Sequence, residues 1–154
     1  MVIKNHSSFF LMVLTIPFIF LLMGCPGQGD RLQLDETTQV KLIGDNICFH
    51  ITNAQNYQPA IISINLRGTS PKKQEFIDNP SLRIRSEQLC IPPSFYQFTD
   101  NEKYIVEFVL TSLGSAAEPR KFVVGVGLDH GQVYGFPLTD REILRPYGSI
   151  EVPE

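Results

Sequence analysis

Apolar and polar residues alternate with a period of two over much of the chain after residue 25. No window there keeps apolar residues at the helical spacing for more than two turns, and alternation is typical of strands with one buried face. The pattern therefore predicts a mainly β, all-β domain. The predicted strands cover residues 40–43, 47–51, 60–66, 82–85, 89–91, 104–111, 122–128, 132–136 and 150–152.

Turn-forming residues separate these strands. Residues 44–46 (Gly-Asp-Asn) and 129–131 (Asp-His-Gly) each fit a tight hairpin turn, and residues 86–87 (Ser-Glu) form a third. Residues 67–80 hold Gly, Pro and Lys and predict a surface loop with one short edge strand. About eight short strands at this spacing favour an immunoglobulin-like or related Greek-key β-sandwich, although the tryptophan usual in immunoglobulin cores is absent.

Two local patterns add detail to the strands. Gly125 and Gly127 leave one face of the strand at 122–128 bare, which predicts either a bulge or the close approach of another backbone. Residues 139–142 (Thr-Asp-Arg-Glu) match the capping box and predict one short helical turn near the C-terminus, which Pro146 ends.

Three aromatic residues follow the prolines at 92–93, which end a strand because neither can donate a ladder hydrogen bond. Phe95, Tyr96 and Phe98 either plug one end of the sandwich or, if exposed, anchor a partner.

The first 24 residues have the layout of a secretion signal, with a short polar start containing Lys4 and an apolar run over 9–23. As a helix this run would rise about 22 Å, short of the roughly 30 Å hydrocarbon core. Pro17 would also interrupt it, so a permanent membrane span is the weaker interpretation.

Residues 21–25 (Leu-Leu-Met-Gly-Cys) resemble the lipobox of bacterial lipoproteins. The resemblance implies cleavage before Cys25 and lipidation of its thiol, and two or more acyl chains anchor a protein stably in a bilayer. Pro26, in place of the aspartate that retains such proteins at the inner membrane, favours the periplasmic face of the outer membrane. The alternative is an ordinary cleaved signal that leaves Cys25 as a free or paired thiol.

Three segments are thus expected. Residues 1–24 form the signal peptide, residues 25–37 carry the lipidated cysteine and a flexible tether, and residues 38–154 form one β-sandwich domain.

With Cys25 lipidated, Cys48 and Cys90 remain, and two thiols exported to an oxidising envelope are expected to pair. Each lies in an apolar run, which predicts a bridge inside the β core. The rival interpretation is a metal site, because Cys48 and His50 would share one side of a strand. It lacks the paired ligands of known zinc spacings, so no metal is expected.

Charge excludes some partners. The segment 1–24 contains one Lys and no acidic residue, so the mature chain would carry 12 basic and 16 acidic side chains, a net charge of −4. No basic stripe is present, which argues against nucleic acid as a partner.

The sequence also lacks the common catalytic motifs. No phosphate loop, nucleophile elbow or zinc helix motif occurs, and the mature chain has only His50 and His130 to titrate near neutral pH. Asp129 and His130, as neighbours at a strand end, would point to opposite sides. The expectation is a binding protein without a cofactor and not an enzyme.

A family resemblance rests on five segments: 25–27 (Cys-Pro-Gly), 44–49 (Gly-Asp-Asn-Ile-Cys-Phe), 89–96 (Leu-Cys-Ile-Pro-Pro-Ser-Phe-Tyr), 137–142 (Pro-Leu-Thr-Asp-Arg-Glu) and 145–148 (Arg-Pro-Tyr-Gly). With them the chain resembles small Gram-negative proteins described as type VI secretion immunity periplasmic lipoproteins. The resemblance implies a periplasmic protein that binds and neutralises a toxic effector. It brings no functional residues with it.

The candidate contacts are Phe95, Tyr96, Asp140, Glu142 and Tyr147, since aromatic anchors with acidic neighbours suit a basic partner. The alternative is that the turn at 139–142 merely starts a helix and Tyr147 packs on the sheet. Two other functions stay open: an inhibitor of a cell-wall-degrading enzyme such as lysozyme, and a non-inhibitory module of an envelope assembly.

Overall fold

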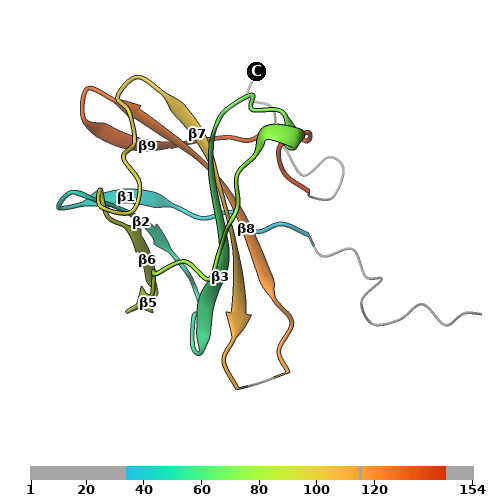
Figure 1. Cartoon of the computed structure of the whole chain (residues 1–154). Helices are drawn as coiled ribbons and strands as arrows, with labels where there is room; N and C mark the ends of the chain where they lie inside the picture. Colours follow the sequence, from blue (N-terminus) through green and yellow to red (C-terminus); the bar gives the residue numbers. More distant parts are fainter. Residues whose placement is uncertain (1–33, 115, 145–154) are drawn as a thin grey trace, which may run out of the picture. The chain divides into compact units, whose positions relative to one another are not determined.

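The computed structural model describes residues 34–114 and 116–144, which form two antiparallel β-sheets packed face to face (Figure 1). The two sheets consist of the strands β1 Val40–Ile43, β2 Asn46–His50, β3 Tyr57–Leu66, β4 Ile77–Asp78, β5 Ile84–Arg85, β6 Gln88–Ile91, β7 Lys103–Ser112, β8 Arg120–Asp129 and β9 Gln132–Phe136. The strand order is β1-β2-β6-β5 in the four-stranded sheet and β4-β3-β7-β8-β9 in the five-stranded sheet. The predicted all-β sandwich is confirmed.

The described part does not include every predicted element. The signal peptide, Cys25, the tether up to residue 33, Tyr147 and the strand at 150–152 lie outside it. Within residues 34–114 and 116–144, no helix has the length and apolar character needed to cross a membrane.

The core lies between the two sheets and follows from the alternation in the sequence. Phe49 of β2 faces Phe108 of β7, with ring centroids 5.4 Å apart, and Phe108 stacks on Phe122 of β8 at 5.0 Å. These three rings are at most 2% exposed, so they join both sheets through one apolar contact. β7 alternates as predicted, whereas β8 is buried on both faces from Phe122 to Gly127; both strands supply much of the rest of the core.

The predicted hairpin turns are present. Gly44, with φ +60°, takes the first central position between β1 and β2, a conformation that favours glycine. His130 and Gly131 both have positive φ between β8 and β9, and so do Ser86 and Glu87 between β5 and β6. Two positive values in a two-residue turn match the right-handed twist of the flanking strands.

The predicted surface loop after β3 contains the expected edge strand, β4, which pairs with β3. It also holds a short 3-10 helix, Pro71–Lys73, which the sequence pattern does not predict.

Gly125 and Gly127 of β8 leave room for residues of the adjacent strand β9. A Cβ built on Gly125 would lie 2.6 Å from the carbonyl oxygen of Phe136, and one built on Gly127 would lie 2.2 Å from the Tyr134 ring. Since real Cβ atoms do not approach so closely, a side chain at position 125 would displace the backbone of β9, whereas one at position 127 would displace the Tyr134 ring. The predicted close approach of another backbone is confirmed.

The C-terminal described segment covers the outer face of the five-stranded sheet. Leu138 and Ile143 pack there on Val123, with Ile105 and Phe136 beside them. In the predicted helical turn, the N–H groups of Glu142 and Ile143 both donate to the carbonyl of Thr139, at 2.9 and 3.2 Å. This is a single hydrogen-bonded turn that does not continue as a helix within the described residues.

The domain begins earlier than predicted. Glu36 forms a parallel bridge with Phe122 of β8, and the side chain of Asp35 is 5% exposed and lies 3.3 Å from the Nζ of Lys121. The Arg120 guanidinium donates hydrogen bonds to both carboxylate oxygens of Glu36, at 2.7 and 2.5 Å. Asp35 and Glu36, which the prediction placed in the tether, are therefore part of the sandwich.

Candidate functional site

Three aromatic rings close one end of the sandwich, called the aromatic end below. Tyr96 and Phe98, from the segment between β6 and β7, meet Tyr104 of β7 in edge-on contacts, with centroids 4.8 to 5.9 Å apart. The Thr99 N–H donates to the Tyr104 hydroxyl at 2.9 Å and fixes the segment. Phe95, Tyr96 and Phe98 are half-buried against the core. These rings plug one end of the sandwich, which is the first of the two predicted alternatives. Part of each ring is also exposed to solvent.

A groove of about 330 Å³ opens beside these rings. Its walls come from β1, β2, β6, the segment after β6 and the end of β8. The lining residues are Leu42, Asp45, Ile47, Ile91, Pro93, Tyr96, Gln97, Phe98 and Leu128. Among them only Asp45 is charged, so the groove combines apolar and aromatic walls with a single carboxylate.

The loops at the aromatic end are acidic throughout. The turn between β1 and β2, the segment 92–102, and the end of β8 with the turn that follows it together contain Asp45, Asp100, Glu102 and Asp129, with His130 and no Lys or Arg. Lys103, which follows Glu102 in the chain, lies over the Phe136 ring at 5.7 Å, on the outer face of the five-stranded sheet. None of the four carboxylates pairs with Lys or Arg within residues 34–114 and 116–144. This end therefore favours a positively charged partner.

The electrostatic setting of Tyr96 agrees with this charge. Burial raises the pKa of Tyr96 above its ordinary value, and the neighbouring Tyr104 and Glu75 raise it further. The Tyr96 hydroxyl therefore stays protonated to a higher pH than that of an ordinary tyrosine.

The five predicted contact residues do not form one patch. Phe95 and Tyr96 belong to the aromatic end, whereas Asp140 and Glu142 lie on the segment that covers the outer face of the five-stranded sheet, and Tyr147 lies outside the described residues. Glu142 already has an internal partner: Arg67 donates to its two carboxylate oxygens at 2.7 and 2.9 Å. The acidic residues found near the rings are Asp45, which lines the same groove, and Glu75, which acts on Tyr96.

Sequence reasoning missed the four carboxylates of the aromatic end because they come from three loops that are far apart along the chain. The sequence does show that these three loops lack Lys and Arg. This absence predicts an acidic surface only when the fold is known to bring the loops to one end.

Glu142 gives the fold a pH-dependent contact. The hydrogen bonds from Arg67 first, and then those from the Thr139 N–H and hydroxyl, lower the pKa of Glu142 to about 2 despite its partial burial. A carboxylate with a lowered pKa stabilises the folded state above its ordinary pKa, and that contribution is lost as the pH falls toward the folded value.

Replacing Glu142 with Gln should therefore lower the free energy of unfolding by about 1 kcal/mol at pH 7, a value reduced by solvent screening. The difference from the natural chain should shrink between pH 4.5 and pH 2. Urea unfolding of both chains across this range measures it. Asp78→Asn, at an exposed carboxylate without an ion pair in the described part, is the control. A difference that does not change with pH would contradict the assignment.

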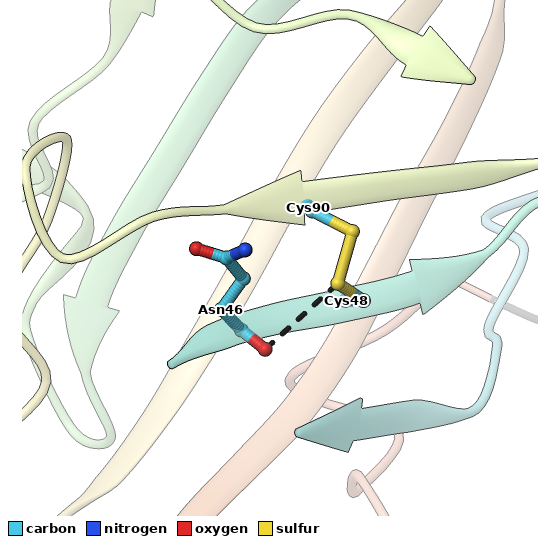
Figure 2. Close-up of a disulfide and its surroundings, with 3 residues drawn as sticks. All are labelled: Asn46, Cys48 and Cys90. Atoms are coloured by element: carbon cyan, nitrogen blue, oxygen red, sulfur yellow. Dashed lines mark hydrogen bonds between the residues drawn. A yellow bond between two sulfur atoms is a disulfide. The ribbon is translucent and has the colours of Figure 1, made fainter. Parts of the chain in front are cut away.

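The predicted disulfide between Cys48 and Cys90 is present and joins directly opposite residues of β2 and β6 (Figure 2). The Sγ of Cys48 also lies 3.8 Å from the carbonyl oxygen of Asn46. Cys48 is buried, with 3% of its surface exposed, but it lies outside the apolar cluster between the two sheets. Ile47 and Phe49 point inward, so the intervening Cys48 lies on the outer face of the four-stranded sheet, beside Lys41 and His50.

The two candidate histidines lie apart from the groove lining. His50 is exposed on the outer face of the four-stranded sheet. His130 Nδ1 lies 2.6 Å from Asp129 Oδ1, so the expectation that these neighbours point apart is wrong, because His130 takes a left-handed turn conformation. Both side chains are largely exposed. Within the described ranges, no three His, Cys, Asp or Glu side chains gather to hold a metal ion.

The fold and the groove define a small disulfide-bridged β-sandwich with a candidate binding surface assembled from loops at one end. Residues 35–131 match the model of a family described as a domain of unknown function (DUF7480), and the chain belongs to this family. The match begins at the residue where the chain joins the sandwich. No curated protein and no solved structure matches the chain.

Proposed function

We propose that this protein is an envelope-tethered immunity protein that binds and neutralises a basic toxic effector delivered by type VI secretion. The observation that carries the proposal is the aromatic end, where half-buried rings line a groove with Asp45, and where the connecting segments contain three more carboxylates and no Lys or Arg. Aromatic anchors surrounded by complementary charge are typical of tight protein interfaces, because the rings supply buried area and the charges speed association.

The sequence supports the compartment. The lipobox resemblance at Cys25 supports anchoring outside the cytosol, and the disulfide is stable in an oxidising compartment. The resemblance to type VI immunity lipoproteins adds the nature of the partner.

The place where the chain enters the domain suits this function. Glu36 lies beside Phe122, near the start of β8, whereas the aromatic end lies at the far end of the same strand, next to Asp129. At about 3.3 Å per residue, these positions are roughly 20 Å apart. The chain thus joins the sandwich at the end of β8 that is farther from the aromatic end.

A competition experiment tests the proposal. A strain that lacks this gene should lose viability when mixed with sibling cells that carry an active type VI system, and should survive beside siblings whose system is disabled. The full-length chain supplied in trans should restore survival, and a basic protein from the attacking cells should co-purify with it. Equal survival of the deletion strain in both mixtures would contradict the proposal.

The same experiment separates the alternatives. Inhibition of lysozyme by the purified chain without any effect on sibling competition would favour an inhibitor of cell-wall-degrading enzymes. Stable envelope partners in the absence of attack would favour an assembly module.

A further inference from the structure

The groove at the aromatic end combines aromatic rings with a carboxylate. The same pair of groups holds an arginine at two other places in the described structure. The guanidinium of Arg120 lies over the Phe122 ring at 4.9 Å while Glu36 holds it with two hydrogen bonds. In both this site and the next, an arginine lies between an aromatic ring and a carboxylate.

The second case is Arg67. Its guanidinium lies 4.7 Å from the centroid of the Phe136 ring and donates to both carboxylate oxygens of Glu142. Planar guanidinium groups suit this setting because one face stacks on the ring while the edge donates two parallel hydrogen bonds.

The groove presents the same two components without the cation. Tyr96 and Phe98 supply rings and Asp45 supplies a carboxylate in one lining, and no Lys or Arg lines it. Leu42 and Leu128 add apolar wall that can cover the aliphatic stem of a long side chain. Its volume of about 330 Å³ corresponds to roughly ten water molecules, which is room for one such side chain.

Resting on the proposed function, we propose that this groove receives an arginine side chain of the partner protein, stacked on the Tyr96 and Phe98 rings and paired with Asp45. Arginine fits better than lysine because the ammonium group is a strongly hydrated point charge without a planar face. Asp45 is then the residue that selects a cation over a neutral side chain of equal size.

A titration with small probes tests the groove without the effector. The ¹⁵N-labelled full-length chain in detergent micelles is titrated with N-acetyl-arginine amide and, separately, with N-acetyl-citrulline amide, a neutral side chain of nearly the same shape. The arginine probe should give saturable amide shifts at Asp45 and at residues 96–98, with an affinity at least about tenfold above that of citrulline. N-acetyl-lysine amide should bind more weakly than arginine.

Two variants complete the design. Asp45→Asn should remove the preference for arginine over citrulline, and Asp78→Asn, at an exposed position on the edge strand β4, should keep it. Equal shifts with arginine and citrulline in the natural chain, shifts elsewhere on the surface, or an unchanged preference in Asp45→Asn would overturn the inference. If an effector co-purifies with the chain while the groove ignores arginine, the inference fails and the proposed function stands. If the groove binds arginine and no effector is found, the proposed function fails alone.

Discussion

Replacing Phe108 with Ala should lower the free energy of unfolding by about 3 to 5 kcal/mol, the range typical of buried Phe-to-Ala changes. Phe108 is 1% exposed and contacts Phe49 in the four-stranded sheet and Phe122 in its own sheet. Its loss would leave a cavity at the contact that joins the two sheets. Urea unfolding of the full-length chain, followed by far-UV circular dichroism, measures the change.

Phe76 provides the matched control. It is 55% exposed, so Phe76→Ala removes the same group from a position with little burial and should change the free energy of unfolding by less than about 0.5 kcal/mol. Equal effects of the two substitutions would contradict the assignment of Phe108 to the centre of the core.

Replacing both Cys48 and Cys90 with Ala should lower the free energy of unfolding by about 4 kcal/mol. The bridge links residues separated by 42 positions, and closing a loop of that size restricts the unfolded chain. For a domain of ordinary stability this is a large share of the total.

Reduction of the natural chain should reproduce the effect of the double substitution, and the reductant should leave the double variant unchanged. Thermal unfolding with and without the reductant measures both. An unchanged melting temperature after complete reduction would show that the pairing of β2 with β6 holds this region without the bridge.

The strands could be predicted because alternation is strong where one face is buried. β7 and β8 place Val106, Phe108, Phe122 and Val124 inward, and their predicted centres match the structure. Their ends extend further than predicted, since hydrogen bonds to neighbouring strands continue past the last alternating residue.

The face that carries the disulfide is marked in the sequence, although the prediction placed the bridge in the core. Asn46 and His50, two positions before and after Cys48, are polar and share its side of β2, whereas Ile47 and Phe49 lie on the other side. The structure agrees with this marking, because Phe49 fits against Phe108 and the intervening Cys48 must then point outward.

The start of the domain could not be predicted. Asp35 and Glu36 look like tether because they are acidic and follow a polar stretch. They are held by Lys121 and Arg120, which lie more than 80 positions further along the chain. Pairings of this kind become visible only after β8 has its place in the sheet.

The candidate site was predicted in part. The rings at 95, 96 and 98 stood out after the two prolines, but the acidic partners assigned to them came from the nearest acidic stretch that looked functional, which contains Asp140 and Glu142. The carboxylates at the aromatic end, Asp45 in the groove among them, come from segments that only the fold brings to one end.

Binding of the co-purified effector to charge-reversed chains tests the central claim most directly. Asp45→Lys with Asp129→Lys alters the aromatic end, and Asp78→Lys with Glu87→Lys changes the net charge by the same amount at two exposed positions outside the groove lining. The account predicts an affinity loss of at least about 30-fold for the first pair and less than about threefold for the second. Equal losses for both pairs, or a greater loss for the second, would contradict it.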